Sequence, residues 1–202
     1  MTSKLGILAY GSLIGDPGPE LAGVIVRVIK EGVTTPFKVE FARASASRAG
    51  APTLVPVTTG GAHIPAQILV LRDDVDESTA RNMLWRRESG RTGVVPVNPS
   101  PVGPNRVMVE RLQDFHGVSV VLYTRIGANI DQLTARKLVQ LAIASARSAN
   151  LQEGRDGISY LAAALRNGVR TPLTAEFEQE IKRQTGATSL PEALRILRSG
   201  QA

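Results

Sequence analysis

Apolar and polar residues alternate, or form short apolar runs, through the first 125 residues of the chain. Short segments of this kind, separated by Gly- and Pro-rich turns, are typical of β-strands. The pattern predicts about six strands, over residues 5–10, 38–42, 53–57, 64–71, 106–112 and 118–124. Residues 21–29 are ambiguous, because their apolar spacing is helical while their β-branched content favours a strand. We predict a helix there.

The spacing of apolar residues becomes helical in the second half of the chain. It predicts helices over residues 131–150, 158–168, 174–186 and 189–200. One more helix interrupts the strands, beginning at Asp76 or Ser78 and ending near Glu88. Strands followed by helices indicate an α+β fold, and short strands must hide their edges. We therefore predict a small mixed β-barrel or curled sheet of about six strands, with surrounding helices and a helical C-terminal region.

Composition narrows the class of protein. The chain has 202 residues, of which 43% are hydrophobic, enough for one domain or for one domain with an appendage. No apolar run is long enough to cross a membrane, and the N-terminus has no secretory pattern, which favours the cytoplasm. Cysteine is absent, so disulfides, thiolate metal sites and cysteine nucleophiles are excluded.

The net charge of +6 raises the alternative of a nucleic-acid-binding protein. The arginines are scattered, however, and only 4% of the residues are aromatic, too few for a platform on which bases stack. We therefore expect a solvated basic surface and no nucleic-acid partner.

Glu88 is the first candidate for chemistry. The apolar stripe of the helix through Ala80 and Leu84 reaches Glu88 one turn later. Burial disfavours the charged form of a carboxylate, and a carboxyl group that exchanges protons near neutral pH suits general acid/base catalysis. The alternative is a surface ion pair with Arg87 or Arg91 at the frayed end of the helix.

The turn Tyr10-Gly11-Ser12-Leu13 directly follows the first predicted strand. A glycine there lets the backbone approach a ligand, and successive N–H groups can bind an anion or a carbonyl oxygen. The glycine spacing fits neither a P-loop nor a dinucleotide fingerprint. As a nucleophile Ser12 is weak, since no G-x-S-x-G surrounds it and only His63 and His116 could act as its base. An ordinary strand-to-loop turn remains the alternative.

These motifs occur in the order "LAYGSL", "EFARAS", "PTLVPV", "IPAQILVL" and "WRRES". In that order they resemble the γ-glutamylcyclotransferase superfamily, in which a strand runs into Tyr-Gly-Ser and a catalytic Glu follows at the end of a helix. The resemblance covers residues 5–125. The later segment "ISYLAAALRNGVRTPL" resembles the helical tail of the ChaC-like, glutathione-degrading branch. Leu13 departs from the family, which most often has Asn at that position.

The resemblance implies a γ-glutamylcyclotransferase-like barrel domain over residues 1–125 and a helical region over residues 126–202 packed on it. It implies an enzyme that cyclises a γ-glutamyl group to 5-oxoproline, needs no metal or cofactor, and acts on a small γ-glutamyl substrate. Glu88 would be the catalytic acid/base. The residues that would bind substrate are Tyr10, Gly11, Ser12, Leu13 and Tyr123.

Two alternatives keep the fold but not this reaction: activity on another γ-glutamyl-amine linkage, and a non-catalytic binding scaffold. Ser45 and Arg48 are weaker candidates for contact with a substrate carboxylate, with solvated loop residues as the alternative. Residues 89–105, rich in Gly and Pro, are either a rim of the pocket or a long connection. Nothing in the sequence indicates an oligomeric state.

Overall fold

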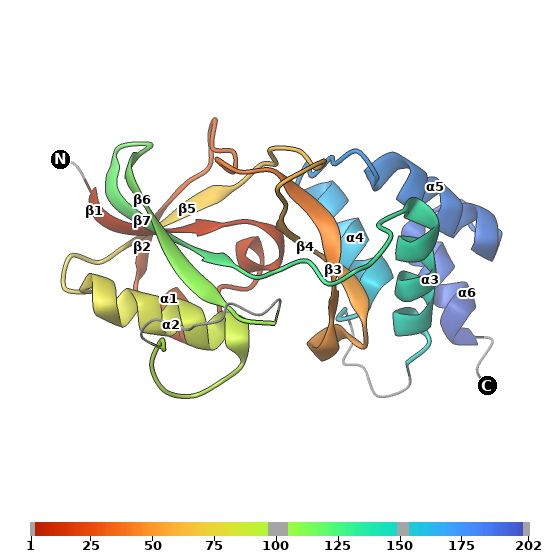
Figure 1. Cartoon of the computed structure of the whole chain (residues 1–202), viewed down its shortest axis with the longest axis horizontal. Helices are drawn as coiled ribbons and strands as arrows, with labels where there is room; N and C mark the ends of the chain where they lie inside the picture. The colour runs from red at the N-terminus through yellow and green to blue at the C-terminus, as the bar shows by residue number, and fades with distance from the viewer. Residues whose placement is uncertain (1–2, 97–104, 149–153, 200–202) are drawn as a thin grey trace. The chain divides into compact units, whose positions relative to one another are not determined.

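The computed structural model describes residues 3–96, 105–148 and 154–199. Within these ranges the fold is α+β, as predicted, with seven strands in two sheets (Figure 1). The chain divides into two compact units, which are described separately. Unit 1 comprises Met1–Pro36 and Pro65–Gly127, and unit 2 comprises Phe37–Ile64 and Ala128–Ala202.

Unit 1 is built on a five-stranded sheet. Its strands lie in the order β2-β5-β1-β7-β6, where β1 is antiparallel to β5 and parallel to β7. The elements of this unit are β1 (Ser3–Ala9), the 3-10 turn η1 (Gly11–Ile14), α1 (Pro19–Ala22), β2 (Ile25–Ile29), β5 (Gln67–Leu71), α2 (Glu77–Ser89), β6 (Met108–Phe115) and β7 (Val118–Arg125).

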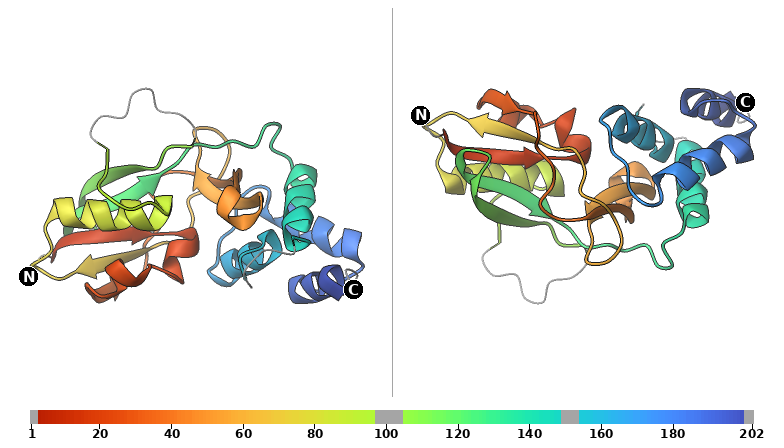
Figure 2. Two further views of the ribbon diagram at one scale, coloured as in Figure 1. Left: turned by 90° about the horizontal axis from the view of Figure 1, so that it is seen from below. Right: turned by 90° about the horizontal axis from the view of Figure 1, so that it is seen from above.

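Helix α2 covers one face of this sheet, as Figure 2 shows. The shared core contains Leu84 and Trp85 of α2, Ile7 of β1 and Leu122 of β7, all of them buried. Burying apolar area contributes about 25 cal/mol per Å² removed from water, which holds the helix on the sheet. The end of α2 is thereby placed near the turn that follows β1.

The sheet of unit 1 is open in the part of the chain that the structure describes. Its edge strands β2 and β6 do not pair with each other, so a curled sheet describes it and a closed barrel does not. The described residues contain seven strands where about six were predicted, because residues 21–29 contain a strand. The helix predicted there was wrong: only α1 is helical, and β2 pairs antiparallel with β5.

Unit 2 combines a two-stranded sheet with helices. The sheet pairs β3 (Val39–Ser45) with β4 (Ala51–Pro56), and the short turn η2 (Ala46–Arg48) joins them. The helices are α3 (Ala135–Ala146), α4 (Gly157–Arg166), α5 (Thr174–Thr185) and α6 (Leu190–Ser199). The predicted helices are found, but the first begins later than expected, with Thr134 as its N-cap.

A buried carboxylate ties β3 to the start of α5. Glu40 is 2% exposed, and its Oε1 accepts hydrogen bonds from the Thr171 hydroxyl (2.6 Å) and the Phe41 N–H (2.8 Å). Its Oε2 accepts from the N–H of Leu173, the N-cap of α5, at 3.4 Å. The strands β3 and β4 thus belong with the helices of unit 2, whereas the sequence analysis placed a boundary near residue 125.

Among the described residues, no helix is long and apolar enough to cross a bilayer.

Candidate functional site

The turn after β1 has the backbone geometry that its glycine suggests. Tyr10 is still extended (φ −139°), and Gly11 then has φ +58°, a left-handed value that side chains other than glycine disfavour. The chain continues as the 3-10 turn η1, in which the Leu13 N–H donates to the Tyr10 carbonyl at 3.3 Å. The first N–H groups of a helical turn have no partner within it, here those of Gly11 and Ser12.

Leu13 therefore contributes less to a binding site than the sequence suggested. Its N–H is used inside the turn, and its side chain is buried in the core that contains Trp85 of α2. A leucine here packs the turn against the helix. The Gly11 and Ser12 N–H groups are not used inside the turn.

Helix α2 brings two charged residues to this turn. It begins at the predicted N-cap, where the Asp76 carboxylate accepts from the Thr79 N–H at 2.8 Å, and it ends at Gly90, whose φ is +65°. These are ordinary start and stop signals of a helix. Arg87 and Glu88 lie in its last turn.

The Glu88 carboxylate forms an ion pair with Arg87. Its side chain is 24% exposed, so it is neither deeply buried among apolar groups nor fully solvated. The Arg87 Nη1 atom that contacts Glu88 Oε1 also lies 3.3 Å from the Ser12 hydroxyl oxygen. One guanidinium nitrogen thus links the carboxylate at the end of α2 to the turn after β1.

The sequence analysis named Arg87 only as a possible ion-pair partner of Glu88 and missed its contacts with the loop after β1. Its Nε and Nη2 donate to the Asp16 carbonyl at 3.0 and 2.5 Å, and Nη2 lies 3.4 Å from the Ser12 hydroxyl. A Cβ added to Gly18 would come within 3.0 Å of the Arg87 side chain, so the loop fits closely around it. The signal was present as the pair Arg87-Glu88, but the partners lie more than 70 positions earlier.

The two tyrosine hydroxyls donate to groups on the strands of unit 1. Tyr10 donates from its hydroxyl to the Thr124 carbonyl at 2.9 Å, which joins the end of β1 to the end of β7. In β7, Leu122 points to the face under α2, so the next residue, Tyr123, points to the opposite face of the sheet. The structure does not bring Tyr123 to the Arg87–Glu88 pair.

Tyr123 has its own polar environment on that face. Its hydroxyl donates to Glu110 Oε2 at 2.5 Å, and Glu110 also pairs with Arg125 at 3.6 Å. Burial, together with the hydrogen bond to Glu110, raises the pKa of Tyr123 to about 12. The phenol is therefore held in its neutral form.

The weaker candidates are placed as follows. Ser45 and Arg48 belong to unit 2, where the Ser45 hydroxyl lies 3.2 Å from that of Ser47 and the Arg48 guanidinium lies 4.9 Å from the centre of the Tyr160 ring. The Ser12 hydroxyl has Arg87 as its partner, which gives no support to a nucleophilic role.

The segment after Glu88 folds back along α2 where it is described. The Gly93 carbonyl accepts from Arg86 at 2.8 Å, and the Val95 N–H donates to the Asn82 side chain at 2.8 Å. Residues 97–104 of the predicted rim lie outside the described residues.

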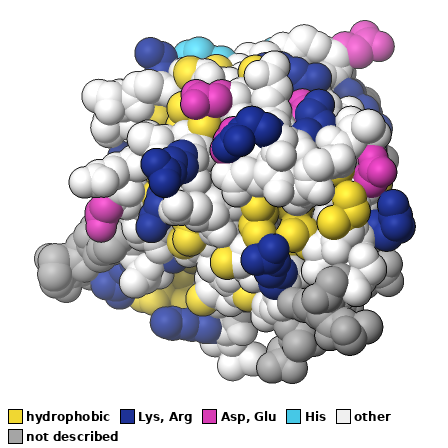
Figure 3. Space-filling model, turned by 90° about the vertical axis from the view of Figure 1, so that its right-hand side faces the viewer, with side chains coloured by type: hydrophobic (Ala, Val, Ile, Leu, Met, Phe, Trp, Pro, Cys, Tyr) yellow, Lys and Arg dark blue, Asp and Glu magenta, His cyan; other side chains and the backbone are white. Residues whose placement is uncertain are grey.

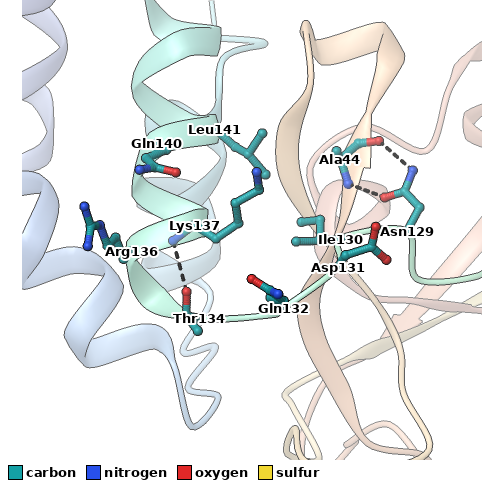
Figure 4. A pocket seen from close by; sticks show the side chains of 10 residues that line it. All are labelled: Ala44, Asn129, Ile130, Asp131, Gln132, Thr134, Arg136, Lys137, Gln140 and Leu141. Carbon is teal, nitrogen blue, oxygen red and sulfur yellow. Dashed lines mark hydrogen bonds between the residues drawn. The ribbon is translucent and has the colours of Figure 1, made fainter.

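A separate hollow of about 540 Å³ lies within unit 2, between the end of β3 and the first turns of α3 (Figure 4). The Asn129 side chain forms one wall, since its Oδ1 accepts from the Ala44 N–H at 2.7 Å and its amide donates to the Ala44 carbonyl at 3.2 Å. Lys137 and Asp131 add opposite charges to the lining. Its residues come from segments far apart in the sequence, which is why no pattern indicated it.

Charge and metal ligands add little elsewhere. On the face that Figure 3 shows, Lys and Arg side chains stand apart among neutral and acidic ones. No group of three or more His, Asp or Glu side chains suited to a metal ion is found in the described ranges.

No protein-family model, curated protein or solved structure matches this chain.

Proposed function

We propose that the chain is a cytoplasmic enzyme of the γ-glutamylcyclotransferase type, which converts a γ-glutamyl compound into 5-oxoproline and a free amine or peptide. The observation that carries the proposal is the Arg87 link between the Ser12 hydroxyl and the Glu88 carboxylate. Two motifs far apart in the sequence are thereby linked through one guanidinium group, which contacts both the carboxylate at the end of α2 and the turn after β1.

The reaction needs little from the protein besides shape and proton transfer. The α-amine of the γ-glutamyl group attacks its own γ-carbonyl carbon, a C–N bond closes a five-membered lactam, and the C–N bond to the leaving amine breaks. Holding the substrate in a curled shape brings the amine close to the carbonyl carbon, which makes the attack effectively unimolecular.

Glu88 is the proposed acid/base. It accepts a proton from the α-ammonium group, which frees the nitrogen lone pair, and later donates that proton to the leaving amine. The attacking nitrogen loses a second proton as it becomes the lactam N–H, and the released amine takes up that proton as its ammonium form. Only an ionised carboxylate can accept a proton. In the structure the Glu88 carboxylate is ion-paired with Arg87.

The N–H groups of Gly11 and Ser12 are proposed to bind an anion. Either the oxyanion of the tetrahedral intermediate or the substrate α-carboxylate fits this role. Gly11 has no side chain that could stand between the backbone and the ligand.

A non-catalytic scaffold is the second candidate. It is favoured by the Arg87–Glu88 ion pair, because a carboxylate that already has a partner is less available as a base. A third outcome is activity confined to γ-glutamyl-amine linkages, since Leu13 stands where the family most often has Asn.

Incubation with substrates separates these candidates. The purified protein is mixed with glutathione, with a γ-glutamyl dipeptide and with a γ-glutamyl-amine, and 5-oxoproline is measured in each. Release from glutathione or the dipeptide supports the proposal, and release from the amine alone narrows the substrate. Calorimetric binding without any 5-oxoproline would favour the scaffold. The absence of both binding and 5-oxoproline would contradict the proposal.

A further inference from the structure

Apart from Glu88, the groups that contact Arg87 compensate little of its positive charge. The Asp16 carbonyl and the Ser12 hydroxyl are neutral, and the Asp16 carboxylate lies farther away, at 3.8 Å, with 80% of its side chain exposed. Exposed charges are screened by water and salt. The Arg87 side chain itself is only 15% exposed. Its close ionic partner is Glu88.

Arg87 is the more firmly held member of the pair. Arg87 has contacts with Asp16, Ser12 and Gly18, all in the loop after β1. Glu88 lies one residue before the last of α2, with Gly90 following the helix. A rotation about the Glu88 side-chain bonds separates the two charges, whereas moving Arg87 would break several hydrogen bonds.

A carboxylate that stays paired with arginine is a weak general base, because the cation stabilises its charged form. Proton transfer therefore requires Glu88 to leave Arg87. Leaving an arginine without an anion in a site that is mostly shielded from water is costly, so another anion must replace the carboxylate.

The proposed substrate carries that anion. In a γ-glutamyl group the α-carboxylate is attached to the same carbon as the α-amine that must lose a proton. Arginine binds carboxylates well, because two parallel N–H groups match the two oxygens. A carboxylate on Arg87 would hold the α-amine beside the displaced Glu88.

We infer that the substrate α-carboxylate replaces Glu88 on Arg87 and thereby frees Glu88 to act as the base. This inference rests on the proposed function and deepens it. Arg87 is a residue that binds substrate, and a free α-carboxylate is a requirement of the substrate class. A γ-glutamyl compound whose α-carboxylate is converted to a carboxamide would bind poorly and leave Glu88 paired.

The test combines two substrates with two enzymes. A γ-glutamyl dipeptide and its α-carboxamide are turned over by the wild-type chain and by Arg87→Gln, and kcat/KM is measured for all four pairs. Hydrogen bonds to charged groups predict that the wild type prefers the free carboxylate roughly 10- to 100-fold. In Arg87→Gln the preference should fall below about threefold, because the groups that interact are coupled.

Arg86→Gln is the matched control. Arg86 precedes Arg87 in α2 but bonds to Glu20 and to the Gly93 carbonyl, so the variant should keep the preference of the wild type. If Arg87→Gln does not fold by circular dichroism, Arg87→Lys replaces it: a lysine keeps the charge but lacks the paired donors, so it should keep only part of the preference.

Three outcomes are distinguishable. Loss of the preference in the Arg87 variant alone supports the inference. An undiminished preference in a folded Arg87 variant overturns the inference and leaves the proposed function standing. If the wild type forms no 5-oxoproline from the dipeptide or from the other γ-glutamyl compounds, the proposed function fails and the inference falls with it.

Discussion

At the scale of single residues, the backbone of Gly11 is the feature that most constrains the turn after β1. Its φ of +58° is left-handed, where a Cβ costs about 1–2 kcal/mol. We predict that Gly11→Ala lowers the free energy of unfolding by about this amount, as measured by urea denaturation. The turn would then have to distort or store the strain.

Gly15 is the matched control in the same turn. Its φ is −92°, and nothing lies within 4 Å of a Cβ added there. Gly15→Ala should leave the free energy of unfolding unchanged or raise it by about 0.4–1 kcal/mol, because alanine restricts the unfolded chain. Equal effects at the two positions would contradict the strained turn.

Tyr123 gives a second prediction, on pH. Its pKa is raised to about 12 by burial and by the hydrogen bond to Glu110, whereas a tyrosine in the unfolded chain ionises near 10. Between these values the folded chain keeps the proton and the unfolded chain has lost it. The contribution of Tyr123 to stability is therefore complete below about pH 10 and is lost as the pH rises to about 12.

Alkaline titration of tyrosine absorbance measures this directly. One of the three tyrosines should ionise last, near pH 12, and this step should be missing in Tyr123→Phe. A variant that keeps the late step would show that another residue is responsible.

At the scale of elements, the attachment of α5 to β3 depends on Glu40. Removing its carboxylate leaves the Thr171 hydroxyl and the Leu173 N–H without the acceptor they have in the interior. An unsatisfied buried group costs about 1–3 kcal/mol, so Glu40→Ala should lower the free energy of unfolding by at least that much. Denaturation followed by helical circular dichroism provides the measurement.

Glu176 in the first turn of α5 is the control, since its side chain is exposed. Glu176→Ala should change the free energy of unfolding by well under about 1 kcal/mol. If both alanine variants were equally stable, Glu40 would not be the anchor.

A comparison of α2 with β2 shows which features of an element can be predicted from sequence. The bounds of α2 follow from local signals: Asp76, one of the two starts predicted, caps the helix, and Gly90 directly follows its last residue. The strand β2 was predicted to be a helix from its apolar spacing, yet it pairs with β5, which lies about 40 residues later. The β-branched content of residues 21–29 favoured a strand while their spacing favoured a helix, and the pairing partner that decides between the two lies outside the segment.

At the scale of the whole molecule, the same limit applies to the sheets and to the site. The strands β3 and β4 form their own sheet in unit 2, although their alternation resembles that of the unit 1 strands. Glu88 and the turn at Gly11 were predicted as partners from motif order, and the contact through Arg87 brings them together. The position of the Arg87 side chain depends on tertiary contacts with Ser12 and Asp16. The sequence next to Arg87 does not reveal these contacts.

The account as a whole depends on Glu88 as the group that moves the proton. Glu88→Gln keeps the size of the side chain but cannot exchange a proton as a carboxylate does. Loss of a general acid/base typically lowers turnover by a factor of about 10² to 10⁴. Glu77→Gln, in the first turn of the same helix and loosely paired with Arg111 at 3.7 Å, is the control.

The most direct measurement is the single-turnover rate of 5-oxoproline formation from a γ-glutamyl dipeptide by the wild type, Glu88→Gln and Glu77→Gln. We predict that Glu88→Gln is slower than the wild type by a factor of about 10² to 10⁴, with substrate affinity changed much less, and that Glu77→Gln matches the wild type. A folded Glu88→Gln variant that forms 5-oxoproline at the wild-type rate would contradict the account.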